Sequence, residues 1–157
     1  MSKVEIEKKI CIEPNFLNEK LLSNIYEKLL EKYINRCIKH NGYILKIYPG
    51  VQILNNVVSN VNSSVYFNVK FKARCLKPEI DSEHECKVCM VFVNGLFAEV
   101  KGVLKIFIPN DRMKKYKFQG IKYTYKDNTI EVDSIITARL NMIKYEKHNF
   151  NCIGTLI

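Results

Sequence analysis

The sequence predicts two consecutive domains: an α+β domain with one helix on an antiparallel sheet, then a domain built from strands alone. Three observations predict this arrangement. Apolar residues recur every four positions in one segment near the N-terminus, and a strict alternation of apolar and polar residues follows. A polar run from Glu79 to Glu85 then precedes several short strand patterns. We place the domains at residues 1–78 and 79–157.

The first domain begins with a strand over residues 4–12 and continues with a helix over about residues 15–40. Asn15 or Asn18 can cap the start of this helix, and Asn41-Gly42 can supply the left-handed conformation that ends it. The four-residue period is typical of a helix packed on a sheet. The apolar positions with this period are Leu17, Leu21, Ile25, Leu29, Tyr33 and Cys37.

Strand patterns follow the helix. Residues 43–48 and 51–54 flank a Pro49-Gly50 turn, and residues 65–74 alternate with apolar side chains at the odd positions and polar ones at most even positions. Alternation of this kind predicts a sheet with one buried face and one wet, basic face.

The second domain contains five predicted strands and a long loop over residues 109–128. Five strands of this size in about 75 residues favour a small closed barrel of the OB type. The predicted strands cover residues 86–93, 96–100, 103–108, 129–143 and 152–157.

The charge is strongly positive and unevenly distributed. Of 157 residues, 25 are Lys or Arg and 16 are Asp or Glu, and residues 32–78 carry eight of the basic side chains with no acid. Such a segment favours an anionic partner, although a solvated basic surface explains it equally well. A second basic segment, residues 114–126, interleaves lysines with aromatic residues, as single-stranded nucleic acid sites do. Tyrosines that anchor a loop to the core give the same pattern.

Several functional classes are not expected. No apolar run approaches the roughly 18 residues of a membrane-spanning helix, and the N-terminus lacks the features of a secretory signal. We therefore expect a protein of the nucleus or cytoplasm with reduced cysteines. Cys86 and Cys89 form a C-x-x-C motif near His84, but a second ligand pair is missing and strand alternation directs the two thiols to opposite faces. We expect no metal, no cofactor and no intrinsic enzymatic activity.

Several ordered segments resemble the seventh subunit of eukaryotic RNA polymerase II and its archaeal and large-DNA-virus counterparts, the larger subunit of the polymerase stalk. The similar segments are residues 12–16, 40–45, 65–73, 94–100, 104–108 and 150–156. The resemblance implies a noncatalytic subunit of a DNA-directed RNA polymerase, with a tip domain that docks on the core and an S1-like OB barrel that faces the transcript. Its implied partners are the largest and the small core subunits, single-stranded RNA, and, as an open alternative, a stalk partner like the fourth subunit.

Candidate site residues follow from the alternation and from the resemblance. Alternation turns Phe97, Lys105, Phe107 and Arg139 to the outside of the barrel, where they form a candidate surface for base stacking and phosphate contact. Packing of Phe97 and Phe107 against the first domain or a loop is the alternative. The resemblance implies polymerase docking by two loops, and the candidate residues there are His40, Asn41, Gly42, Tyr43, Asn60 and Asn62.

The sequence also departs from the family pattern. Residues 101–103 contain one apparent extra residue, the segment Cys86 to Met90 lacks a common glycine, and no tail follows Ile157. These differences suggest a trimmed, divergent member of viral type, which would place the protein in the virion and the host cytoplasm. A free-standing S1-type RNA-binding module is the main alternative function, and an enzyme that uses Cys86 or Cys89 is a remote one.

Overall fold

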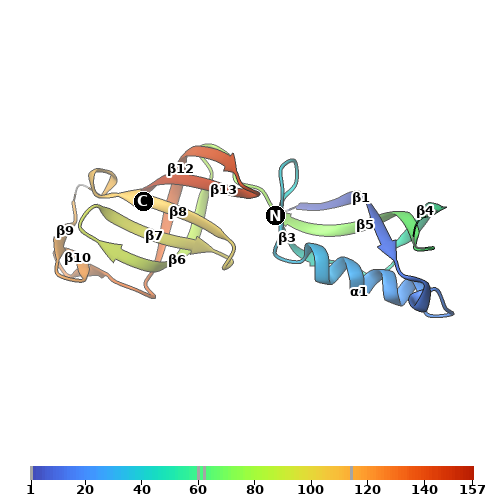
Figure 1. Ribbon diagram of the computed structural model, residues 1–157. Coiled ribbons are helices and arrows are strands. Elements are labelled where there is room, and N and C mark those ends of the chain that lie inside the picture. The colour runs from blue at the N-terminus through green and yellow to red at the C-terminus, as the bar shows by residue number, and fades with distance from the viewer. Residues whose placement is uncertain (1, 60, 62, 114) are drawn as a thin grey trace. The chain divides into compact units, whose positions relative to one another are not determined.

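The structure is a computed structural model that describes residues 2–59, 61, 63–113 and 115–157, with Ser2 described for its backbone only. The chain divides into two compact units, Met1–Lys77 and Pro78–Ile157 (Figure 1). Each unit is described by itself. No helix among the described residues is long and apolar enough to cross a membrane.

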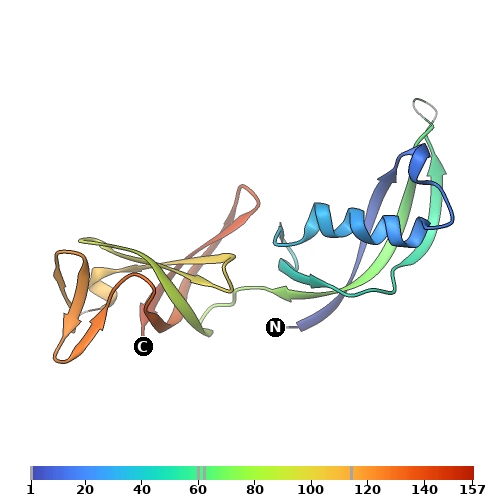
Figure 2. The ribbon, with the colours of Figure 1, turned by 90° about the horizontal axis from the view of Figure 1, so that it is seen from below.

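The N-terminal unit is one helix on an antiparallel sheet, as predicted. Its elements are β1 (Ser2–Ile12), η1 (Pro14–Phe16), α1 (Leu21–Tyr33), β2 (Cys37–Ile38), β3 (Gly42–Ile47), β4 (Gln52–Val58) and β5 (Val65–Leu76). Strand β5 is central: it pairs with β1 along one edge, and with β4 and then β3 along the other. Helix α1 lies across one face of this sheet (Figure 2). The core between them contains Ile25 and Leu29 of the helix and the odd-numbered residues Phe67 to Cys75 of β5.

The predicted helix over residues 15–40 was too long at both ends. Neither Asn15 nor Asn18 caps α1, which begins after Lys20. Asn18 instead forms a turn, because its Oδ1 accepts a hydrogen bond from the Lys20 N–H at 2.8 Å. At the other end, Asn35 adopts a left-handed conformation with φ of 59°, which asparagine tolerates better than most residues. Cys37 then pairs with Tyr43 in the sheet. The prediction that Cys37 belongs to the apolar face of the helix was therefore wrong.

The C-terminal unit contains the predicted five-stranded barrel. The barrel strands are β6 (Glu83–Phe92), β7 (Gly95–Val100), β8 (Leu104–Pro109), β12 (Ile135–Glu146) and β13 (Asn149–Leu156). They close in the order β12-β13-β8-β7-β6, with β13 parallel to β8 and the other pairs antiparallel. This is the strand order of an OB fold. The predicted inward positions are buried as expected: Leu96, Ala98, Leu104, Ile106, Ile108, Ile136, Ala138 and Leu140.

The segment predicted as a long loop contains regular structure. A short helix, η2 (Asn110–Arg112), precedes a small sheet of β9 (Lys117–Gln119), β10 (Lys122–Tyr125) and β11 (Asn128–Ile130). Tyr123 of β10 is buried, and its hydroxyl donates a hydrogen bond of 2.6 Å to the carbonyl of Phe92 at the end of β6. The tyrosine therefore fastens this sheet to the barrel.

Candidate nucleic-acid interface

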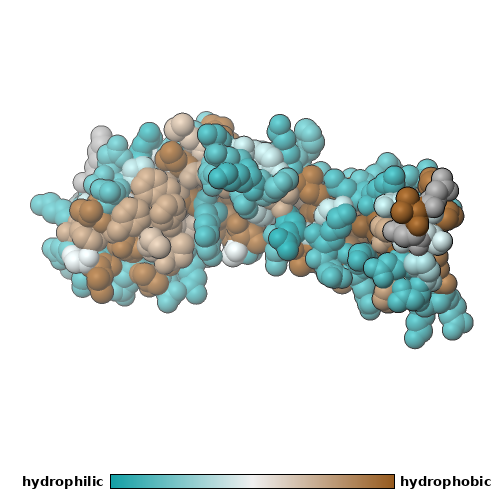
Figure 3. Space-filling model, in the orientation of Figure 1, coloured by the Kyte–Doolittle hydropathy of each residue, from teal (hydrophilic) through white to brown (hydrophobic). Residues whose placement is uncertain are grey.

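Three phenylalanine rings form a cluster on the outside of the barrel. Phe97 of β7 and Phe107 of β8 are opposite each other in the sheet, with ring centroids 5.0 Å apart. Phe92 of β6 contacts both, at 5.8 Å from Phe97 and 6.0 Å from Phe107. All three side chains are half-buried. Figure 3 shows apolar side chains gathered over this part of the barrel. The second and third strands of an OB fold are the ones that bind oligonucleotides in this class of barrel.

Phe92 reaches this cluster through a β-bulge, which strand alternation does not predict. Cys86 and Val88 point into the barrel, so simple alternation would direct Phe92 inward as well. The pairing of β6 with β7 shifts between Val88 and Met90, which inserts Cys89 as an extra residue. An inserted residue reverses the alternation beyond it. The sequence pattern around Cys89 contains no signal for this bulge.

Gly95 leaves room for the cluster. A Cβ at this position would collide with the carbonyl oxygen of Ile108 and would lie 2.9 Å from Cε1 of Phe107. Only glycine therefore allows β7 and β8 to approach closely beneath the Phe107 ring.

Lys105 lies next to the cluster on β8. It is exposed and faces Glu99 on β7 and Asn151 on β13. Among the residues that the structure describes, no carboxylate oxygen lies within 4.0 Å of its amine. Apolar side chains continue the cluster around the barrel, since Ile153 pairs with Phe107 and Met90 pairs with Phe97. The structure thus brings Phe97, Phe107 and Lys105 together.

Arg139 lies elsewhere on the barrel. It faces outward from β12, which is separated from β8 by β13. Its Nη2 donates to Oε1 of Glu83 at 2.8 Å, and this interaction raises the pKa of Arg139 further. Both side chains are half exposed. The structure does not bring Arg139 together with the other three candidate residues.

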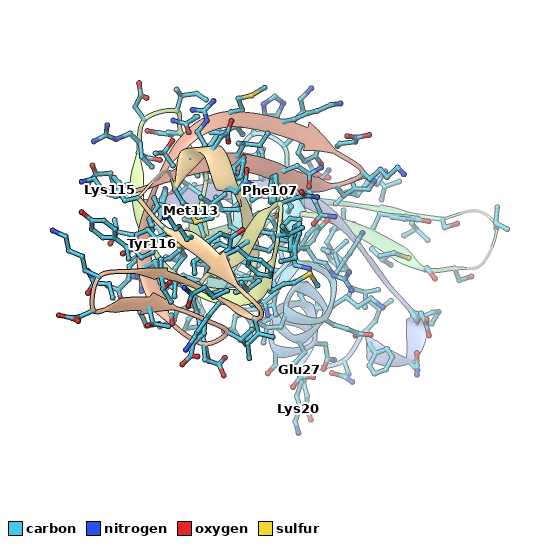
Figure 4. The ribbon with its side chains drawn as sticks, turned by 90° about the vertical axis from the view of Figure 1, so that its left-hand side faces the viewer. Lys20, Glu27, Phe107, Met113, Lys115 and Tyr116 are labelled. Atoms are coloured by element: carbon cyan, nitrogen blue, oxygen red, sulfur yellow. The ribbon has the colours of Figure 1, made fainter. Side chains whose placement is uncertain are left out.

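The tyrosines of the second basic segment, residues 114–126, do not all have the same structural role. Tyr123 is an anchor, and burial raises the pKa of its hydroxyl. Tyr116 and Tyr125 contact each other with ring centroids 5.7 Å apart and line a hollow of about 520 Å³. Met113, Lys115 and Tyr116 lie together at this end of the barrel (Figure 4). Tyr123 therefore anchors the segment to the barrel, whereas Tyr116 and Tyr125 are half-buried beside the hollow.

The C-x-x-C motif does not form a paired site. Cys86 is buried, and burial, with a smaller contribution from Glu85, raises its pKa to about 11. Cys89 is exposed in the bulge, and its Sγ donates to the carbonyl of Phe97 at 3.3 Å. Burial and the nearby Glu99 also raise its pKa. Within the described part of the chain, no group of three or more His, Cys, Asp and Glu side chains is arranged to hold a metal ion.

This arrangement predicts selective thiol modification. We expect Cys89 to be alkylated by iodoacetamide in the folded barrel, while Cys86 and Cys152 react only after unfolding, because both are buried and have pKa values raised to about 11. Since the pKa of Cys89 is raised as well, its rate should still increase between about pH 8 and pH 10. Peptide mass mapping measures the site and the rate. Modification of Cys86 at the same rate as Cys89 would contradict the described burial.

The predicted docking residues are only partly accessible. His40 is exposed and Asn41 is half-buried, whereas Gly42 and Tyr43 are buried in β3. Asn60 and Asn62 lie outside the described residues. A partner that approaches this turn would therefore meet His40 and Asn41.

The chain thus consists of a helix-on-sheet unit followed by an OB-type barrel. Residues 7–53 match the family model described as the SHS2 domain found in the N terminus of Rpb7p/Rpc25p/MJ0397. The match extends from β1 into β4 of the N-terminal unit, and the resemblance to polymerase stalk subunits is confirmed over these residues. Comparison with curated proteins gave no match.

Proposed function

We propose that this protein is a noncatalytic stalk subunit of a DNA-directed RNA polymerase. The SHS2 match over residues 7–53 carries this proposal, because it relates the N-terminal unit to a domain of polymerase stalk subunits. In this proposal the N-terminal unit docks on the polymerase core near His40 and Asn41. The barrel contacts single-stranded RNA through the cluster of Phe97 and Phe107.

The physical features of the barrel support RNA contact. Half-buried aromatic rings on the outside of the barrel offer stacking surfaces to any base, and a neighbouring lysine offers a cation to the phosphate backbone. Binding through such groups is tolerant of sequence and sensitive to salt. We therefore expect weak RNA binding that weakens further as salt rises.

Affinity purification of the tagged protein from its native cells, followed by mass spectrometry, tests docking. We expect the two largest polymerase subunits in fixed proportion to the bait. A His40→Ala, Asn41→Ala double variant should recover less polymerase while remaining folded, because neither side chain is buried. Recovery of ribosomal or RNA-decay proteins without polymerase would instead favour a free-standing S1-type RNA-binding module.

The salt dependence of RNA affinity tests the cationic residues. Lys105→Ala should reduce the slope of log affinity against log salt by about 0.7, the value for one phosphate contact with a single strand. Lys105→Ala combined with Arg139→Ala should flatten it further. Arg139→Ala alone should have the smaller effect, because the guanidinium already donates to Glu83. Fluorescence anisotropy over a salt series measures the slope, and an unchanged slope in the double variant would remove both residues from the site.

A further inference from the structure

The hollow of about 520 Å³ lies at the end of the barrel where η2 follows β8. Its volume is within the roughly 300–1,000 Å³ that is typical of ligand pockets. Three parts of the unit line it: η2 with the residues that follow it, the strands β10 and β11, and the end of β13. Figure 4 shows Met113, Lys115 and Tyr116 together at this place. We call the space the η2 hollow, and the lining residues that matter here are Arg112, Met113, Lys115, Tyr116, Tyr125 and Leu156.

The walls of the η2 hollow are held by hydrogen bonds to the barrel. The backbone N–H of Asn110 donates to the carbonyl of Asn94 at 2.9 Å, and its side-chain amide donates to the carbonyl of Val93 at 3.2 Å. The hydroxyl of Tyr123 fastens β10 to the carbonyl of Phe92. The hollow is therefore part of the folded barrel, and a ligand would not have to order its walls.

The inner surface of the hollow is apolar. The side chain of Met113 is only 2% exposed, and Leu156 and the ring of Tyr116 are half-buried. A large apolar side chain that entered the hollow would remove both its own surface and this surface from water. Burial of apolar surface is the main favourable contribution in pockets of this kind.

The cations Arg112 and Lys115 at the hollow have no carboxylate partner in the part of the chain that the structure describes. No carboxylate oxygen there lies within 4.0 Å of either side chain. Nη1 of Arg112 donates to Oδ1 of Asn141 at 3.3 Å, and the same oxygen accepts a hydrogen bond from the hydroxyl of Thr155. The neutral amide thus positions the guanidinium and leaves its charge uncompensated.

The charge around the hollow favours an acidic ligand. Asp111 is the acidic side chain that lines it, against the two cations Arg112 and Lys115. Residues 112–126 carry six basic side chains and no acid. A surface with this imbalance attracts anionic groups.

The tyrosines favour a peptide over RNA as this ligand. The amine of Lys126 lies over the ring of Tyr125, at 5.2 Å from its centroid, and the ring of Tyr116 is tilted by 56° against that of Tyr125. Tyr123 is buried as an anchor. Base stacking needs open ring faces, whereas a bulky side chain needs an apolar space.

We propose that the η2 hollow binds an acidic peptide segment of a partner protein. One large apolar side chain of the peptide enters the hollow, and the carboxylates on either side of it pair with Arg112 and Lys115. Hydrogen bonds between such cations and carboxylates are charge-assisted and stronger than neutral ones. The site depends neither on polymerase docking by the N-terminal unit nor on RNA contact at Phe97 and Phe107.

A tryptophan-containing peptide tests the site with the full chain. The chain contains no tryptophan, so tryptophan fluorescence reports on the peptide alone. The probe has seven residues, a central tryptophan with three acidic residues on each side. At low ionic strength we expect saturable binding and a shift of the emission to shorter wavelength, because the indole leaves water. Saturable binding without this shift would mean attraction by net charge alone and would overturn the proposal.

The variant Arg112→Gln, Lys115→Gln should bind this peptide about tenfold more weakly and remain folded, since both side chains are exposed. The control Lys101→Gln, Lys147→Gln removes the same charge from exposed turns. These turns precede β8 and β13, whereas the hollow lies beyond the ends of the two strands. The control should change affinity less than about twofold. Equal losses in the two variants would overturn the site.

Two measurements test the apolar part of the site. Tyr116→Ala removes a wall and should abolish most of the emission shift, whereas Tyr145→Ala should keep it. Tyr145 is a matched control because it is also half-buried in a tilted ring pair, with Phe150 at 5.1 Å. A peptide with alanine in place of tryptophan should compete at least about tenfold more weakly with the probe. Equal competition, or loss of the shift in both folded variants, would overturn insertion of a side chain.

Other occupants give different results. Oligouridylate that displaces the peptide equally well from the wild type and from Phe97→Ala, Phe107→Ala would assign the hollow to RNA. A dimer in sedimentation experiments that Arg112→Gln, Lys115→Gln dissociates would assign it to a second copy of the chain. Either result would overturn the peptide site. Neither depends on recovery of polymerase, so failure here leaves the proposed function intact.

Discussion

The double variant Phe97→Ala, Phe107→Ala should bind single-stranded RNA about 100-fold more weakly than the wild type. Each base that stacks on an aromatic side chain contributes about 1–3 kcal/mol, so the loss of two stacking positions removes close to 3 kcal/mol of binding free energy. The rings are suited to this role because they lie opposite each other on β7 and β8, with centroids 5.0 Å apart and half-buried side chains. Fluorescence anisotropy with an oligouridylate measures the effect.

A leucine pair provides the matched control. Phe97→Leu, Phe107→Leu keeps apolar volume over Phe92 and Gly95 but removes the aromatic faces, so it should lose nearly as much RNA affinity with a smaller loss of stability. Thermal unfolding of both variants measures that difference. Wild-type RNA affinity in the leucine variant would mean that the rings only pack on the protein, which is the alternative that the sequence leaves open.

The parts of the fold that depend on local alternation could be predicted from the sequence. The apolar residues of β5 and of the barrel strands point inward because a strand with one buried face must repeat every two residues. The helix could be recognised from its period, but its end could not, because the left-handed Asn35 and the pairing of Cys37 with Tyr43 are set by the sheet. Strands of three and four residues, such as β9 and β10, are too short to show a period.

The candidate sites depend on pairings between distant residues, which alternation does not provide. Alternation correctly turned Arg139 outward, yet the closure of the barrel pairs β12 with β6 and places Glu83 beside it. In the same way, the sequence shows that Arg112 and Lys115 are cations but not that they lie beside Leu156 of β13. The bulge at Cys89, which adds Phe92 to the cluster, is likewise fixed by the pairing of β6 with β7.

The largest loss of stability is expected for Gly42→Ala, which should lower the free energy of unfolding by about 4 kcal/mol. Gly42 has φ of 86°, a conformation that costs an L-residue about 1–2 kcal/mol. A Cβ there would also collide with the carbonyl oxygen of Leu76 and lie 2.7 Å from Cα of Lys77, and overpacking against backbone adds about 1–3 kcal/mol. Denaturant unfolding followed by circular dichroism measures the change.

Gly50→Ala is the matched control. Gly50 has a similar φ of 96°, but a Cβ added there would have no atom of the described residues within 4 Å. The substitution should cost only about 1 kcal/mol, so the difference between the two variants isolates the collision with β5. Equal losses would mean that the close approach of β3 to the end of β5 is absent in solution.

Gly42 also lies in the turn for which the family resemblance implies polymerase docking, and the two roles predict different results. If Gly42 is needed only for folding, the amount of polymerase recovered with Gly42→Ala in a pulldown should fall only in proportion to the fraction of the variant that is unfolded. His40→Ala, Asn41→Ala should lose polymerase without losing stability, because those side chains are exposed and half-buried at the turn. A stable Gly42→Ala protein that fails to recover polymerase would contradict the structural role, and would place the backbone of this turn in the docking contact itself.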